Sequence, residues 1–66
     1  MELVTTEDYT GYYMEDIERE LGPIRWPTFQ EWIAGQTTAI HAIHNEKIVI
    51  YAWDYDRFLA GLPALD

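Results

Sequence analysis

The sequence predicts a single small α+β domain over residues 1–66, with the order helix, helix, β-hairpin, short helix. Apolar residues before residue 22 follow the spacing of an amphipathic helix. Two segments rich in β-branched residues flank a short polar loop near residue 45. A glycine stands at the end of each expected helix. Because the chain has no cysteine, packed apolar side chains must hold the fold together.

The first helix is expected over about residues 6–21, with a threonine at position 5 or 6 as its cap and Gly22 at its end. At 100° per residue, the apolar side chains gather on one arc and carboxylates fill most of the remainder. Gly11 costs about 1 kcal/mol relative to alanine inside a helix, so a start after residue 11 stays open. The apolar arc consists of Tyr9, Thr10, Tyr13, Met14, Ile17 and Leu21.

A second helix is expected over about residues 28–34, because Thr28 and Glu31 have the spacing of a capping box and Gly35 closes the segment. Between the two helices, residues 22–27 (GPIRWP) contain two prolines and are interpreted as a stiff linker.

The hairpin is expected over about residues 37–53, where TTAIHAI and KIVIYAW flank a loop at Asn45. Both of its faces are largely apolar, so one must pack on the helices and the other needs a cover or a partner. A last helix over about residues 54–60 begins with Asp54 as its cap and ends at Gly61. The expected core comprises Tyr13, Ile17, Leu21, Phe29, Trp32, Ile33, Ile40, Ile48, Ile50, Trp53, Phe58 and Leu59.

Few residues carry catalytic or metal chemistry. His41 and His44 are three apart, which points them to opposite faces of a strand and makes them a poor chelate. Asp54 and Asp56 match no calcium-loop pattern and are interpreted as helix-start charges. The chain lacks cysteine, serine and a glycine-rich phosphate loop. We therefore expect a protein without catalytic residues, metal or cofactor.

The net charge of −8 comes from twelve acidic and four basic residues. Such a field disfavours nucleic acid and anionic membranes and favours a partner with a basic surface. No apolar run is long enough to span a bilayer, and the first residues carry no signal segment, so we expect a cytoplasmic protein. Because so short a chain buries little surface, a homodimer stays open.

Seven of the twelve acidic residues lie within residues 1–22. Several of them crowd the C-terminal half of the expected helix, where its dipole favours cations, and one tyrosine falls among them. This pattern predicts a partner-binding face. Two alternatives also explain the excess of acidic residues: a solvated face that keeps the protein soluble, and adaptation to a high-salt cytoplasm. The predicted face consists of Glu7, Asp8, Tyr12, Glu15, Asp16, Glu18 and Glu20.

The segment TTEDYTGYYMEDIERE and the overall charge resemble the small acidic inhibitors of phages and mobile elements that mimic DNA. That class includes anti-restriction and anti-CRISPR proteins and inhibitors of uracil-DNA glycosylase. The resemblance implies carboxylates that occupy the basic groove of a nucleic-acid enzyme in the host cell cytoplasm. The alternative is a small dimeric structural or interaction adaptor that uses the apolar face of its hairpin.

Overall fold

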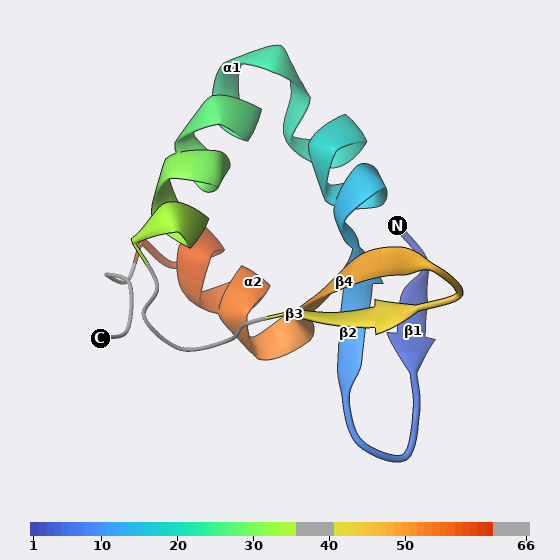
Figure 1. Ribbon diagram of the computed structural model, residues 1–66. Helices are drawn as coiled ribbons and strands as arrows, with labels where there is room; N and C mark the ends of the chain where they lie inside the picture. The colour runs from blue at the N-terminus through green and yellow to red at the C-terminus, as the bar shows by residue number, and fades with distance from the viewer. Residues whose placement is uncertain (36–40, 62–66) are drawn as a thin grey trace.

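The computed structural model describes residues 1–35 and 41–61 and contains a four-stranded antiparallel sheet and two helices (Figure 1). In chain order the elements are β1 Leu3–Thr5, β2 Thr10–Tyr13, α1 Met14–Ala34, β3 His41–His44, β4 Lys47–Tyr51 and α2 Ala52–Leu59. The α+β class is therefore confirmed. The expected order of helix, helix, hairpin, helix is wrong, because the chain runs strands, helix, strands, helix.

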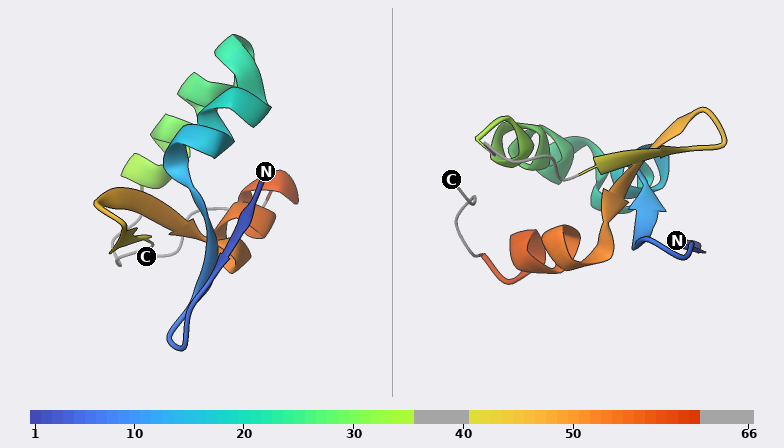
Figure 2. Two further views of the ribbon diagram at one scale, coloured as in Figure 1. Left: turned by 90° about the vertical axis from the view of Figure 1, so that its right-hand side faces the viewer. Right: turned by 60° about the horizontal axis from the view of Figure 1, so that its bottom comes forward.

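The strands lie in the order β1-β2-β4-β3, so β2 and β4 form the centre of the sheet. In the pairing of β2 with β4, Tyr12 lies opposite Ile50, so both side chains project from the same face of the sheet. On that face they pack against residues of α1 and α2. Both helices therefore cover the same face of the sheet, as the two views in Figure 2 show.

The start of the chain is a β-hairpin rather than the helix expected over residues 6–21. The Thr6 amide donates to the Tyr9 carbonyl over 2.9 Å, and the Thr6 hydroxyl accepts from the amides of Asp8 and Tyr9. Thr6 thus closes a turn between β1 and β2 instead of capping a helix. The helix begins only at Met14, because residues 10–13 pair with β4 on one side and β1 on the other.

Gly11 is the residue that makes this central pairing possible. A Cβ atom at position 11 would lie 2.3 Å from the Ile50 carbonyl oxygen and 2.7 Å from Cγ1 of Val49. Both separations are below any real contact, and the first is to backbone that cannot move aside. The glycine that weakens a helix is therefore required in strand β2.

The α1 helix bends at Gly22, whose φ of 77° and ψ of 178° are accessible to glycine alone. Pro23 then starts the second half of the helix, where its missing amide hydrogen and fixed φ cost nothing. The GPIRWP segment is thus helical after Gly22, and the expectation of a linker before a helix at residues 28–34 is wrong. Figure 1 shows the bend as the apex between the two halves.

The expected β3–β4 hairpin is present over residues 41–51, and the predicted residues 37–40 lie outside the described part of the chain. Asn45 and Glu46 have φ values of 52° and 63°, which is the geometry of a two-residue type I′ turn. Strand β4 passes directly into α2 at Ala52, so the expected helix at 54–60 starts two residues earlier. Its N-cap is Tyr51, and Asp54 lies inside the first turn.

The core is an aromatic cluster around Phe29, which is fully buried. Its ring lies 4.8 Å from that of Phe58 and 5.9 Å from that of Tyr55, both edge to face. The fully buried Ile17 and Ile50 and the buried Leu21 join this cluster.

Several core expectations are corrected. Trp53, Leu59 and Ile48 are 64%, 47% and 40% exposed, and Ile40 lies outside the described residues. The two errors in α2 share one cause, because Tyr55 and Phe58 take its inner face and turn Trp53 and Leu59 outward.

Replacing Gly11 with alanine should lower the free energy of unfolding by about 2–3 kcal/mol, since the new methyl group overlaps the Ile50 carbonyl and Val49. Gly35→Ala is the matched control, because Gly35 is exposed with a φ of −81° that alanine adopts freely. It should be neutral or stabilising by up to about 1 kcal/mol. Urea denaturation of both variants measures these changes in the free energy of unfolding. Equal changes in the two variants would contradict the close contact of Gly11 with β4.

Candidate functional site

Four carboxylates lie on the first half of α1, at positions that flank or face away from the buried Ile17 and Leu21. We call this set the α1 acidic face; it consists of Glu15, Asp16, Glu18 and Glu20. All but Asp16 are exposed, and Asp16 is partly covered. Because Ile17 and Leu21 hold the helix against the core, the carboxylates are presented from a rigid element.

Two of these four charges are already paired within the protein. Lys47 on β4 donates to Glu15 over 2.9 Å, and Arg19 forms an ion pair with Asp16 one turn earlier on the helix. The hydrogen bond from Lys47 and its charge hold the pKa of Glu15 below its ordinary value, and Glu15 raises the pKa of Lys47 in return. Among the residues described, Glu18 and Glu20 have no ion-pair partner.

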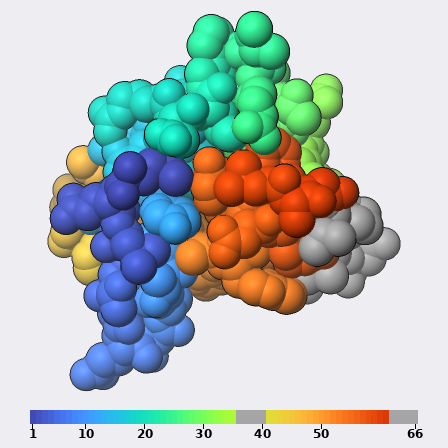
Figure 3. Space-filling view, turned by 180° about the vertical axis from the view of Figure 1, so that it is seen from behind, coloured from blue at the N-terminus to red at the C-terminus, as the bar shows by residue number. Residues whose placement is uncertain are grey.

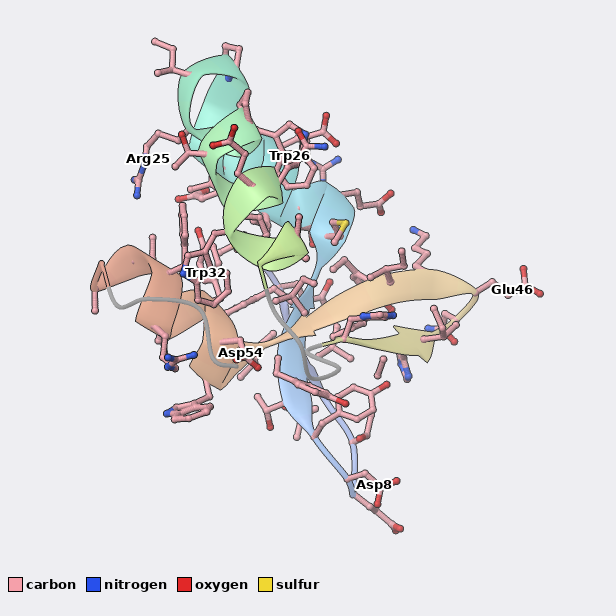
Figure 4. All side chains as sticks on the ribbon, turned by 60° about the vertical axis from the view of Figure 1, so that its left-hand side comes forward. Asp8, Arg25, Trp26, Trp32, Glu46 and Asp54 are labelled. Carbon is pink, nitrogen blue, oxygen red and sulfur yellow. The ribbon has the colours of Figure 1, made fainter. Side chains whose placement is uncertain are left out.

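The other two predicted acidic residues are elsewhere. Glu7 and Asp8 lie in the turn between β1 and β2, not on a helix. Figure 4 places Asp8 at the far tip of that hairpin, at the opposite end of the molecule from α1. The single acidic face predicted from the sequence is therefore two separate acidic regions.

The roles expected of the two neighbouring tyrosines are exchanged. Tyr12 is half-buried and packs edge to face on Tyr55, with ring centroids 5.5 Å apart. Tyr13 points to the opposite face of the sheet, where Lys47 lies 5.4 Å from its ring and Asn45 donates to its hydroxyl. The exchange follows from strand geometry, in which successive side chains alternate between faces. Tyr12 therefore does not stand among the helix carboxylates.

His41 and His44 both belong to β3, where their spacing of three points them to opposite faces. His44 lies against the Tyr13 ring, with centroids 6.3 Å apart. In residues 1–35 and 41–61, no three side chains of His, Asp or Glu gather as a set of metal ligands.

An open cavity of about 520 Å³ lies where the end of the β1–β2 hairpin meets the start of α2. Figure 3 shows the hairpin projecting below α2, with a notch between them. Sequence reasoning missed this region, since its two segments meet only through the pairing of β2 with β4. Its walls are formed by Asp8, Tyr9, Thr10, Tyr51, Ala52, Trp53, Asp54 and Asp56.

Asp54 is the buried carboxylate of this region, with only 5% of the residue exposed. Arg57, also buried, places Nη1 3.8 Å from an oxygen of Asp54, which is an ion pair longer than a hydrogen bond. Burial raises the pKa of Asp54, and the charge of Arg57 opposes that rise.

Comparisons with protein-family models, with curated proteins and with solved structures found no match. Within the described ranges, no helix is long and apolar enough to cross a membrane. The physical properties of the surfaces above must therefore carry the functional argument.

Replacing Lys47 with methionine should raise the pKa of Glu15 toward its ordinary value, because the main cause of its lowering is removed. In the wild type, the ion pair stabilises the folded state fully at pH values above the pKa that Glu15 has in the unfolded chain. This stabilisation is lost as the pH falls through the lower pKa that Glu15 has in the folded protein. An NMR titration of the Glu15 carboxyl carbon measures the shift. Arg19→Met is the control and should move that pKa less, since Arg19 contributes least. An unchanged Glu15 pKa in the Lys47 variant would contradict the ion pair.

Proposed function

We propose that this protein is a non-enzymatic inhibitor that binds a basic, nucleic-acid-handling protein through the α1 acidic face. One observation carries the proposal: Lys47 and Arg19 pair with Glu15 and Asp16, while Glu18 and Glu20 keep exposed charge on the same rigid helix. A chain with a net charge of −8 adds a long-range field of the same sign. That combination supports a partner rich in arginine and lysine.

The expected mechanism is occupation of a nucleic-acid site. A groove that binds phosphates is lined with arginine and lysine, and carboxylates on a helix satisfy the same donors. Such association is fast at low ionic strength and weakens as salt is added. This is the mode of action of phage-type anti-defence and anti-CRISPR proteins that mimic DNA, and it needs no catalytic group.

The double variant Glu18→Gln, Glu20→Gln should weaken binding to such a partner by roughly five- to thirtyfold, at about 0.5–1 kcal/mol for each exposed charge. Surface plasmon resonance against basic nucleases, restriction enzymes and CRISPR effector complexes provides the measurement. Most of the loss should fall on the association rate.

The matched control is Glu31→Gln with Glu46→Gln, which removes the same charge from exposed positions outside the α1 acidic face. Equal losses in both variants would show that only net charge matters and would contradict a defined face. Competition between this protein and DNA for the partner distinguishes mimicry from binding elsewhere. Absence of binding across the whole panel would reject the proposal.

A second candidate function is a dimeric interaction adaptor, favoured by an exposed apolar pair on the β3–β4 hairpin. Ile43 and Ile48 are direct cross-strand neighbours and are 64% and 40% exposed. Strand β3 also lies at the edge of the sheet, where its outer backbone groups can pair with another strand. A second copy of the chain would cover both the apolar pair and the edge.

Sedimentation velocity tests this candidate directly. If the adaptor reading is correct, the wild type sediments as a dimer and Ile43→Lys as a monomer, because a charge enters the seam. Ile24→Lys is the control, since Ile24 is 86% exposed near the bend of α1, and it should leave the dimer intact. A wild type that stays monomeric at high concentration would eliminate this function.

A further inference from the structure

The cavity between the β1–β2 hairpin and α2 has aromatic walls. The rings of Tyr9 and Tyr51 meet with centroids 5.7 Å apart and planes inclined at 55°, so their faces form an angled surface. Trp53 stands beside them on α2 and is 64% exposed. An exposed tryptophan next to two tyrosines is a composition typical of binding sites, since such rings combine apolar area with a negative face.

The charge of the same cavity has one sign. Asp8, Asp54 and Asp56 line it, and none of the described residues that line it is basic. Three carboxylates repel an anion, and a neutral apolar ligand would strip water from them without compensation. The cavity therefore suits a cation.

Asp54 gives independent evidence that a donor belongs here. It is nine-tenths buried and lines the cavity, yet it accepts no hydrogen bond from the described residues. Its ion pair with Arg57, at 3.8 Å, is too long to supply one. Buried carboxylates are normally hydrogen-bonded, so the acceptor capacity of Asp54 is available to a ligand that enters the cavity.

Arg57 shows which cation fits these groups. Its guanidinium lies 5.2 Å from the Trp53 ring and 6.0 Å from the Trp32 ring, beside the Asp54 carboxylate. The protein thus already places a guanidinium against tryptophan and aspartate on the inner side of this region. A planar guanidinium stacks flat on rings, and its rigid fork donates to both oxygens of one carboxylate, whereas an ammonium is a compact point charge with neither a plane nor a fork.

We propose that this cavity binds the guanidinium group of an arginine side chain on a protein partner, between the tyrosine and tryptophan rings and the three aspartates. The site is separate from the α1 acidic face and uses aromatic contact as well as charge. The cavity would add a specific contact for one side chain, whereas the α1 acidic face attracts a partner by long-range electrostatics. The two can fail independently, because they share no residue.

The probe is a hexa-arginine peptide, with a hexa-lysine peptide and tetramethylammonium for comparison, titrated into the labelled protein and followed by NMR. Hexa-arginine should shift the Trp53 indole and the Tyr9 and Tyr51 amides. It should bind several-fold more tightly than hexa-lysine, because only guanidinium stacks and pairs at once. Shifts confined to α1, or equal affinity for hexa-lysine or tetramethylammonium, would overturn the assignment.

The double variant Asp8→Asn, Asp56→Asn should weaken hexa-arginine binding by about tenfold, from two charge-assisted contacts. Both residues are exposed, so the fold is retained. Glu18→Gln with Glu20→Gln removes the same charge from the α1 acidic face. It should weaken hexa-arginine binding only about twofold, because it reduces long-range electrostatic attraction without removing a contact in the cavity. Trp53→Leu should also weaken binding while leaving the aspartates in place. Equal losses in the two double variants would refute the cavity as the site.

Discussion

The contact of the Phe29 ring with the rings of α2 is the interaction on which the remainder of the structure depends. Phe29 meets Phe58 and Tyr55 edge to face, and Tyr55 meets Tyr12 of the sheet in the same way. This series of rings ties α1 to α2 and both helices to β2. Ring pairs in this geometry contribute about 0.5–1.5 kcal/mol each beyond the area they bury. A chain of this length, without disulfides, has few other sources of stability.

Both proposed surfaces follow from this arrangement. Ile17 and Leu21 lie in the Phe29 cluster, so the α1 carboxylates that alternate with them must face outward. Tyr55 anchors α2 from within, which leaves Trp53 on the outside next to the β1–β2 hairpin. The exposed carboxylates of both surfaces are thus placed by the aromatic core, whereas Asp54 is buried and paired with the buried Arg57.

The α+β class and some elements of this fold could be predicted from local pattern alone. The β3–β4 hairpin follows from its β-branched residues and the Asn45 turn, and the outward face of α1 follows from the spacing of Ile17 and Leu21. Residues 9–13 could not be assigned in this way, because Tyr9, Tyr13 and Ile17 satisfy a helical period equally well. The contact that decides between helix and strand is remote in sequence: Gly11 pairs with Tyr51 in β4.

The pairing of β2 with β4 also explains why the orientations of Tyr12 and Tyr13 and the cavity could not be predicted from the sequence. The exchange of Tyr12 and Tyr13 follows once β2 is a strand, and the cavity exists only because β2 and β4 bring Tyr9 beside Tyr51. Pro23 and Pro27 resemble a linker in sequence, yet a helix accepts a proline at its first position, which Pro23 occupies directly after the bend at Gly22. Pro27 lies one turn further on, inside the helix.

The central claim is that aromatic packing holds this fold while most of its charge is available to a partner. The most direct test is the free energy of unfolding from about 0.1 M to about 1 M NaCl, which shortens the Debye length from about 10 Å to about 3 Å. If the charges are not structural, screening relieves the repulsion among the excess carboxylates, and the free energy of unfolding rises with salt. A fall in that free energy over the same range would show that the ion pairs of Glu15 and Asp16 hold the fold, and would contradict the account.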